Sequence, residues 1–101
     1  MPLNTEVREP QRQHPQVLIV DDDTSILRML QRTLAAYHPV TAQGATEALA
    51  LLEQCRPALL ITDYLMPDMT GAELLARARE QHPNLKALIL TGYGALLEQE
   101  P

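Results

Sequence analysis

The sequence of 101 residues has few aromatic side chains: three Tyr, with neither Phe nor Trp. Aromatic side chains provide the platforms on which unpaired bases stack, so their scarcity argues against a single-strand nucleic-acid binder. The core must instead be built from Leu, Ile, Val and Ala. Hydrophobic residues make up 46% of the chain, which is enough for one small domain and leaves no room for a second.

Basic residues are also scarce, because Lys86 is the one lysine and the formal net charge is −5. The phosphates of a nucleic acid would be repelled by this charge unless a basic patch were segregated on one face. The sequence contains no such patch. We therefore expect no direct binding to nucleic acid.

The side chains that hold zinc are few and badly spaced. Cys55 is the single cysteine, which excludes an intramolecular disulfide and fits a reducing compartment, and its apolar helical setting predicts a packing role. His38 and His82 lie near predicted helix ends, with no Cys or carboxylate at ligand spacing. We expect both histidines to face solvent and no zinc site to form.

Long apolar runs are missing as well. No stretch approaches the length of a membrane span, and the first residues lack the apolar segment of a secretory signal. These features predict a cytoplasmic protein with no membrane partner. Residues 1–15 are polar and contain three prolines, which predicts a flexible N-terminal tail ahead of a domain over residues 16–101.

From residue 16 onward, short apolar runs alternate with stretches of helical period. The runs predict strands at residues 16–20, 39–42, 58–62 and 85–92, and the periodic stretches predict helices near residues 24–37, 44–56 and 72–80. This alternation is typical of an α/β three-layer sandwich with a parallel sheet. The closing segment, YGALLEQEP, has room for a helical turn and little more.

Reactive side chains follow three of the four predicted strands. Asp21 and Asp22 end the first strand in "LIVDDD", Asp63 follows the third strand, and Thr91 ends the fourth. In an open parallel sheet, sites lie beyond the carboxyl ends of the strands. Three carboxylates in one pocket cannot all stay ionised without a cation, and hard oxygen ligands suit Mg²⁺. The sequence therefore predicts a magnesium site.

A carboxylate beside such an ion suits phosphoryl transfer. The ion screens the phosphate oxygens, and the carboxylate attacks phosphorus without needing a base. Thr91 can donate its hydroxyl to a phosphoryl oxygen. Alone, "LIVDDD" is equally well explained as an acidic helix cap, the role we expect for Asp23, and Asp63 alone is better explained as a loop residue. The joint spacing of the motifs favours a functional site.

Three motifs in order resemble the receiver domains of two-component response regulators: "LIVDDD", "ITDYLMPDMTG" and "LILTG". The resemblance covers residues 16–94. It implies a flavodoxin-like receiver topology and a response regulator module in a phosphorelay. Such a module receives a phosphoryl group from a sensor histidine kinase or phosphotransfer protein with Mg²⁺, and then switches conformation. It catalyses its own phosphorylation and dephosphorylation and is otherwise not an enzyme.

The same resemblance implies roles for individual residues. Asp63 would be the phosphoacceptor, and Asp22 and Asp63 would be direct Mg²⁺ ligands. Asp21 would act through a bound water, and Leu65 would contribute its backbone carbonyl to the metal. Thr91 would hydrogen bond to the phosphoryl group and act as the switch residue.

The chain departs from the family pattern after residue 94. The family continues into a fifth strand that bears a Lys and an aromatic residue, and neither is present here; Lys86 lies at the wrong end of the fourth strand. We therefore expect a domain truncated before its fifth strand and last helix. Its fourth strand would be an exposed edge through which chains self-associate.

Two alternatives stay open at the level of sequence. One is a receiver-like interaction module that works without phosphorylation. The other is a phosphatase of the haloacid dehalogenase type with Asp21 as nucleophile, because Asp21-x-Asp23 and "LILTG" imitate its first two motifs. The phosphatase leaves "ITDYLMPDMTG" unexplained. Acid-labile phosphate on Asp63 separates the receiver from the interaction module, and turnover of a phosphate ester would favour the phosphatase.

Overall fold

The structure, a computed structural model, describes residues 16–91 and 94–98, and the predicted tail over residues 1–15 lies outside these ranges. In chain order the elements are β1 (Val17–Val20), α2 (Thr24–Thr33), a 3-10 turn (Ala35–Tyr37), β2 (Pro39–Ala42), α3 (Ala45–Leu52), β3 (Leu59–Asp63), α4 (Gly71–Ala78), β4 (Lys86–Thr91) and β5 (Gly94–Glu98). None of the helices in these ranges has the length and apolar character that crossing a bilayer requires.

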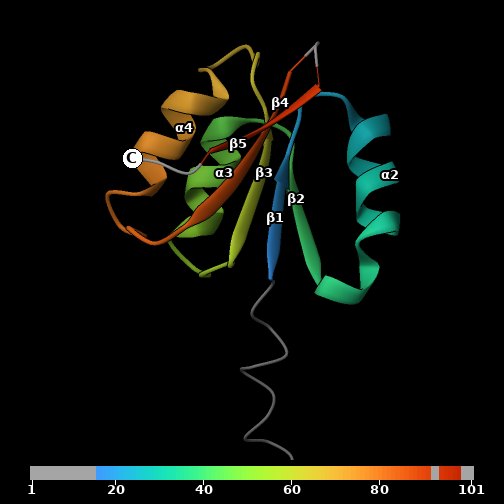
Figure 1. Ribbon diagram of the computed structural model, residues 1–101, viewed down its shortest axis with the longest axis horizontal. Helices are drawn as coiled ribbons and strands as arrows, with labels where there is room; N and C mark the ends of the chain where they lie inside the picture. Colours follow the sequence, from blue (N-terminus) through green and yellow to red (C-terminus); the bar gives the residue numbers. More distant parts are fainter. Residues whose placement is uncertain (1–15, 92–93, 99–101) are drawn as a thin grey trace, which may run out of the picture.

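The sheet has the strand order β2-β1-β3-β4-β5, and β1 to β4 run parallel. Helix α2 covers one face, whereas α3 and α4 lie on the other (Figure 1). This arrangement confirms the predicted α/β three-layer sandwich with a parallel sheet and flavodoxin-like topology. Because β1 is next to β3, and β3 next to β4, the carboxyl ends of these three strands lie at one edge of the sheet.

Residues along the buried strands pack alternately into two apolar clusters. Leu18, Val20 and Leu60 belong to the cluster beneath α3 and α4, whereas Ile19 and Ile61 belong to the cluster beneath α2. Successive strand side chains point to opposite faces, so the run VLIV is buried on both. Burying one such aliphatic side chain stabilises the fold by about 1.5–3 kcal/mol. The two clusters thereby hold β1 and β3 in fixed register.

The helices begin where their caps are and end earlier than predicted. Asp23 caps α2, as expected, by accepting a hydrogen bond from the Ser25 amide at 2.9 Å. Thr70 and Glu73 form a capping box at the start of α4. Helix α3 ends at Leu52 instead of continuing toward residue 56, and the thiol of Cys55 donates to a backbone carbonyl in the last turn.

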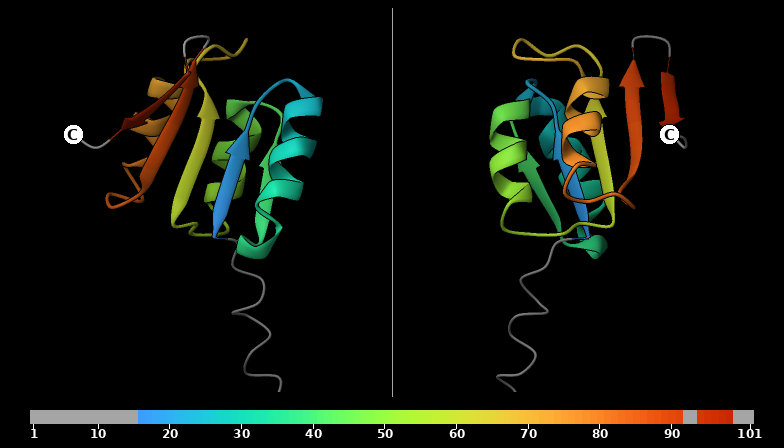
Figure 2. Two further views of the ribbon diagram at one scale, coloured as in Figure 1. Left: turned by 45° about the vertical axis from the view of Figure 1, so that its right-hand side comes forward. Right: turned by 90° about the vertical axis from the view of Figure 1, so that its left-hand side faces the viewer.

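The segment after β4 differs from the prediction. Residues Gly94–Glu98 form β5, which pairs antiparallel with β4 so that Thr91 lies opposite Gly94 (Figure 2). The predictions of a helical turn after β4 and of an exposed edge on β4 were therefore wrong. A strand edge presents unpaired backbone groups, and pairing with the next segment satisfies them where a helical turn would not. Self-association through the edge of β4 loses its structural basis.

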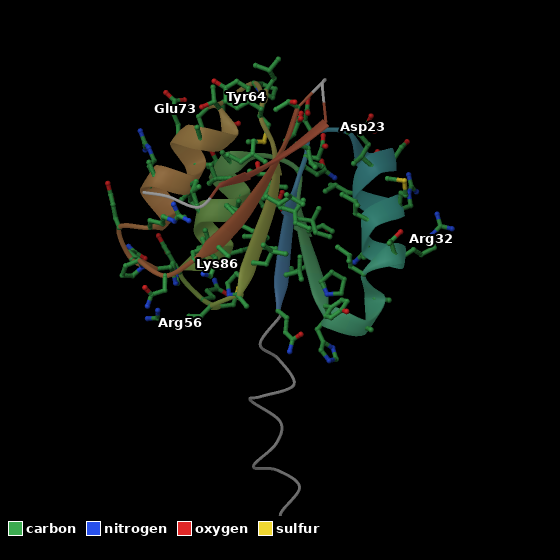
Figure 3. All side chains as sticks on the ribbon, in the orientation of Figure 1. Asp23, Arg32, Arg56, Tyr64, Glu73 and Lys86 are labelled. Atoms are coloured by element: carbon green, nitrogen blue, oxygen red, sulfur yellow. The ribbon has the colours of Figure 1, made fainter. Side chains whose placement is uncertain are left out.

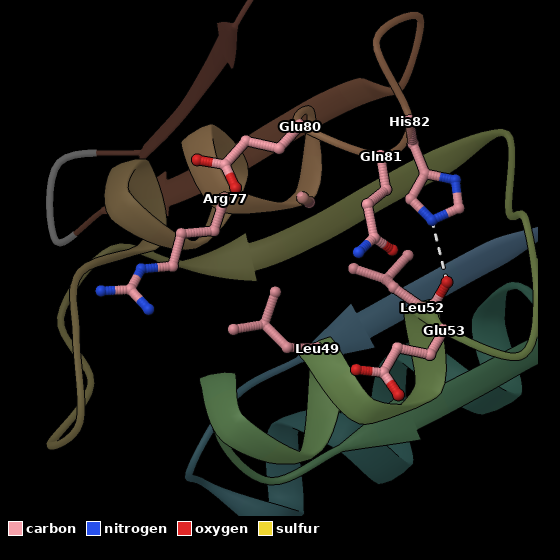
Figure 4. Close-up of a pocket in the computed structure, with 8 residues that line it drawn as sticks. Leu49, Leu52, Glu53, Arg77, Glu80, Gln81 and His82 are labelled. Atoms are coloured by element: carbon pink, nitrogen blue, oxygen red, sulfur yellow. Dashed lines mark hydrogen bonds between the residues drawn. The ribbon is translucent and has the colours of Figure 1, made fainter.

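His82 is buried, with 9% of its surface exposed, so the prediction that it faces solvent was wrong. Its Nε2 donates to the carbonyl of Leu52 at 2.8 Å, and its Nδ1 lies 3.4 Å from Nη1 of Arg56. These partners assign the proton to Nε2. A cavity of about 380 Å³ lies beside this ring, between α3 and α4 (Figure 4). His38 is exposed, as predicted.

Gly71 marks a close approach of α4 to β3, and we expect it to be intolerant of substitution. A Cβ at this position would lie 2.5 Å from the backbone oxygen of Asp63 and 3.0 Å from the side chain of Thr62. Because backbone cannot rotate away, Gly71→Ala should lower the free energy of unfolding by about 1–3 kcal/mol, as overpacking does. Urea unfolding measures this change.

Gly44→Ala is the matched control for that substitution. Its added Cβ would lie 3.3 Å from a carboxylate oxygen of Asp68, a milder overlap than the 2.5 Å contact with backbone at Gly71. We expect a smaller loss of stability there. If Gly71→Ala proved as stable as the unaltered protein, the close approach would not constrain this position.

Candidate functional site

Three carboxylates meet at the carboxyl edge of the parallel strands. Asp21 and Asp22 follow β1, and Asp63 is the last residue of β3. The parallel register pairs Val20 with Thr62, so the next residues of both strands emerge side by side. Carboxylate oxygens of the three aspartates, one from each, all lie within 4.8 Å of one another. The structure thus brings together the acids that the sequence placed far apart.

The acid cluster is defined as Asp21, Asp22 and Asp63. Asp23 and Tyr64, each next in the chain to a member of this cluster, are labelled at one end of the molecule in Figure 3. Arg56 and Lys86 are at the opposite end in the same view. Lys86 begins β4, so it cannot reach the carboxyl edge of the sheet. This position agrees with the prediction that Lys86 plays no part at the site.

The electrostatics of the acid cluster favour a cation. Burial raises the pKa of Asp21, of which 3% is exposed, and the charges of Asp63 and Asp22 raise it further. Burial also raises the pKa of Asp63, with a smaller contribution from the charge of Asp22. The rise in the pKa of Asp21 is partly offset by the backbone amide of Asp23, which donates a hydrogen bond to Oδ1 of Asp21 at 2.9 Å. A bound divalent ion would relieve both the desolvation and the repulsion.

The donor set fits Mg²⁺. All three side chains offer hard carboxylate oxygens, which suit this ion better than softer metals that prefer nitrogen or sulfur. Asp22 is exposed and Asp63 is half-buried, so the cluster is open on one side to water and to an incoming phosphate. Mg²⁺ keeps several waters and needs only one or two carboxylates. The residues present therefore fit the ion.

The segment after β3 places Leu65 two residues beyond the proposed phosphoacceptor. The Tyr64 amide donates to the carbonyl of Leu90 at 2.8 Å, and the Gly71 amide donates to the carbonyl of Tyr64 at 2.7 Å. These bonds close residues 64–71 into a loop beside the acid cluster. The side chain of Leu65 is 71% exposed and points away from the core.

Thr91 lies on the neighbouring strand. The register of β3 and β4 pairs Asp63 with Leu90, and Thr91 follows as the last residue of β4. Thr91 is half-buried and stands at the same edge of the sheet as the acid cluster. Residues 92–93, which follow Thr91 in the chain, lie outside the described residues.

Two polar contacts near the site were missed by the sequence analysis. Thr62 is fully buried, and its hydroxyl donates to the backbone carbonyl of Asp63 at 3.0 Å. Asp68 reaches across to α3 and accepts hydrogen bonds from the amide and the hydroxyl of Thr46, at 2.9 and 3.1 Å. The capping box of Thr70 and Glu73 was also not named there, although the three-residue spacing of Thr and Glu is a recognisable local signal for it. The bond between Asp68 and Thr46 has no local signal.

The raised pKa of Asp21 gives a pH prediction for the metal-free protein. A carboxylate whose folded pKa lies above its unfolded value stabilises the fold fully below about pH 3.8, and this contribution is lost as pH rises through the folded pKa. At pH 7 the ionised Asp21 therefore destabilises the fold. Asp21→Asn keeps an acceptor for the Asp23 amide and removes the charge. We expect it to melt a few degrees higher than the unaltered protein at pH 7 in a chelator.

The melting temperatures of Asp21→Asn and the unaltered protein are also compared at lower pH, without metal. As the pH is lowered toward 4, the difference in melting temperature between Asp21→Asn and the unaltered protein should shrink, because Asp21 then becomes protonated. Thermal unfolding followed by circular dichroism measures both proteins. An Asp21→Asn variant that melts lower than the unaltered protein at pH 7 without metal would contradict this electrostatic account.

Comparisons with known proteins agree with this geometry. Residues 17–99 match the sequence profile of the response regulator receiver domain. The response regulator receiver protein CpdR of Brucella abortus is 37% identical over 82 residues, which are 79% of this chain and 68% of CpdR. The photosynthetic apparatus regulatory protein RegA of Rhodovulum sulfidophilum is 36% identical over 84 residues, which are 81% of this chain. The chain spans 46% of RegA, less than half its length.

Solved structures show the same fold. A CheY-like response regulator receiver domain protein from Methanospirillum hungatei is 38% identical, with a TM-score of 0.74 over 83% of this chain and 69% of that one. TrrA of Thermotoga maritima, solved in complex with Mg²⁺-BeF, is 31% identical, with a TM-score of 0.72 over 78% of this chain and 70% of TrrA. The chain therefore belongs to the response regulator receiver domain family, the phosphoacceptor signalling modules of two-component systems.

Proposed function

We propose that this chain accepts a phosphoryl group on Asp63 from a sensor histidine kinase or a phosphotransfer protein, with Mg²⁺ in the acid cluster. The observation that carries the proposal is the convergence of Asp21, Asp22 and Asp63 within 4.8 Å at one edge of the sheet. TrrA, a structural neighbour, is described in complex with Mg²⁺-BeF, which supports the choice of ion.

Each residue has a role in the proposed site. Asp22, Asp63 and the backbone carbonyl of Leu65 would hold Mg²⁺, and Asp21 would contact it through a water. The ion supplies positive charge that screens the phosphoryl oxygens and favours the ionised carboxylates. Burial of Asp21 keeps this side chain in place, and its bond to the Asp23 amide fixes its rotamer. The site is thereby organised before the donor arrives.

In the proposed reaction, a carboxylate oxygen of Asp63 attacks the phosphorus of a phosphohistidine. A P–O bond forms, the P–N bond breaks, and the electron pair of that bond stays on the imidazole nitrogen of the donor. Asp63 needs no general base, because a carboxylate attacks without losing a proton. The acyl phosphate would then be lost by hydrolysis: water attacks phosphorus, the P–O bond to Asp63 breaks with its electron pair left on the carboxylate, and inorganic phosphate takes the protons of the water.

The output of this reaction would be a conformational change. A phosphoryl group adds about 1.5–2 negative charges to the edge of the sheet. Thr91, at the adjacent end of β4, would donate its hydroxyl to a phosphoryl oxygen and move with it, which makes it the proposed switch residue. The chain would act as a signalling module whose only chemistry is its own phosphorylation and dephosphorylation. The proposal keeps the cytoplasmic location and the lack of nucleic-acid and membrane partners expected from the sequence.

The position of Asp23 disfavours the phosphatase alternative. A haloacid dehalogenase site would need Asp23 beside the nucleophile as an acid, but its side chain caps α2 through the Ser25 amide. The acid cluster instead joins Asp21 and Asp22 to Asp63, the residue which that alternative left unexplained. The second alternative, an interaction module that works without phosphorylation, is decided by the labelling experiment.

Labelling with a small phosphodonor tests the proposal. The protein is incubated with an acyl phosphate and Mg²⁺, and acid-labile phosphate is measured against a sample that contains a chelator. We expect incorporation of phosphate that requires the metal. Lack of incorporation with a small donor, together with no transfer from a phosphorylated histidine partner, would support the interaction module instead.

A further inference from the structure

The loop that follows the proposed phosphoacceptor is anchored to a different helix. This loop, defined as residues 64–70, leaves β3 at Asp63 and enters α4 at Gly71. One carboxylate oxygen of Asp68, near its middle, accepts hydrogen bonds from both the backbone amide and the hydroxyl of Thr46. Thr46 lies in the first turn of α3, 22 residues earlier in the chain. Asp68 therefore ties the loop to α3.

Asp68 acts as a helix cap for α3, although it lies far from that helix in the sequence. The backbone cap residue of α3 is Gly44, which has no side chain to accept from the first amides of the helix. Asp68 takes that part from a distance, and its carboxylate occupies the space beside Gly44 that a Cβ would enter. The amide of Thr46, with a smaller contribution from that of Ala45, holds the pKa of Asp68 below its usual range. The carboxylate is therefore charged at neutral pH.

The loop is held at its ends as well as at Asp68. The backbone amide of its first residue, Tyr64, donates to the carbonyl of Leu90, and the Tyr64 carbonyl accepts from the Gly71 amide. Met66 and Met69 pack partly buried against the cluster beneath α3 and α4. Leu65 lies between the Tyr64 anchor and Asp68.

We propose that Asp68 is a positioning residue for the magnesium site, because it holds the loop 64–70 so that the backbone of Leu65 keeps its place relative to the acid cluster. The inference rests on the proposed function, since it takes Leu65 as a metal ligand. Asp68 itself does not belong to the acid cluster and contacts α3 rather than the site. Its effect on the metal is therefore indirect.

Calorimetric titration with Mg²⁺ tests this role in the full chain. Asp68→Ala should weaken the affinity for Mg²⁺ by about tenfold, which is the lower end of the range found when residues that orient metal ligands are removed. Asp68→Asn keeps an acceptor oxygen for Thr46 and should recover most of the affinity. Thr46→Val, which removes one of the two bonds, should have a smaller effect than Asp68→Ala.

Glu47→Ala is the matched control. Glu47 accepts a hydrogen bond from the Gln43 amide at 2.9 Å at the same end of α3, and this bond does not involve the loop. Its loss should weaken the start of α3 and leave the Mg²⁺ affinity unchanged. Equal losses of affinity in Glu47→Ala and Asp68→Ala would overturn the proposal, because the effect would then be one of helix stability.

The rate of labelling separates positioning from general damage. In Asp68→Ala the rate should fall at low Mg²⁺ and recover at saturating Mg²⁺, since the chemistry at Asp63 is intact. An unchanged Mg²⁺ affinity in Asp68→Ala, with a tenfold or greater loss in Asp22→Ala, would overturn the role of Asp68 and leave the proposed function standing. If the unaltered protein bound no Mg²⁺, both would fall.

Discussion

Asp63→Asn should incorporate no acid-labile phosphate from a small phosphodonor with Mg²⁺. The amide lacks the charged oxygen that, in the proposed reaction, attacks phosphorus, and it replaces one of the proposed anionic metal ligands. The substitution is nearly isosteric. It removes a carboxyl group whose pKa is raised by burial and by the charge of Asp22. The fold should therefore be kept, with an unchanged or slightly higher melting temperature. Radiolabelled phosphate counted after neutral gel filtration measures the incorporation.

The control for this prediction is Asp23→Asn. Asn is as good a helix cap as Asp, so the bond to the Ser25 amide and the stability of α2 should be retained. Labelling of Asp23→Asn should equal that of the unaltered protein. Labelling of Asp63→Asn at the rate of the unaltered protein would remove Asp63 from its role and would point to another acceptor.

Asp22→Ala should weaken Mg²⁺ binding by at least about tenfold, which corresponds to about 1.4 kcal/mol. The substitution removes a proposed direct anionic ligand, which stands exposed beside Asp63. The loss cannot be assigned to protonation of Asp63, because the charge of Asp22 raises the pKa of Asp63 and its removal leaves Asp63 more fully ionised. The affinity is measured by calorimetric titration at pH 7.

The result also separates the metal from the acceptor. Labelling of Asp22→Ala should be slow at low Mg²⁺ and should rise as more Mg²⁺ is added, because Asp63 is still present. An affinity equal to that of the unaltered protein would show that Asp22 does not bind the ion, even if Asp63 is the acceptor. Asp23→Asn again serves as control, and its Mg²⁺ affinity should not change.

The parts of the fold that depend on local pattern could be predicted from the sequence. The run VLIV is a strand buried on both faces, and Asp23 caps the helix that follows it. The convergence of Asp21, Asp22 and Asp63 also followed from sequence, because the carboxyl ends of parallel strands meet at one edge. Strand order alone was enough to bring the acids together.

The parts that depend on distant contacts could not be predicted in this way. His82 was expected in solvent because it follows a helix, but the chain turns there and places the ring against the carbonyl of Leu52, 30 residues away. The bond between Asp68 and Thr46 joins residues that no short motif relates. Strand β5 is a different case, because it pairs with the neighbouring strand β4, but the sequence of the segment carries no strong signal for a strand or for a helical turn.

A crystal structure of the protein with Mg²⁺ and beryllofluoride tests the central claim most directly. We expect one ion at about 2.0–2.1 Å from oxygens of Asp22 and Asp63 and from the Leu65 carbonyl, with Asp21 linked to it by a water. Beryllofluoride should be bonded to a carboxylate oxygen of Asp63. A crystal in which the three aspartates share no ion at saturating Mg²⁺, or in which beryllofluoride binds elsewhere, would contradict the account.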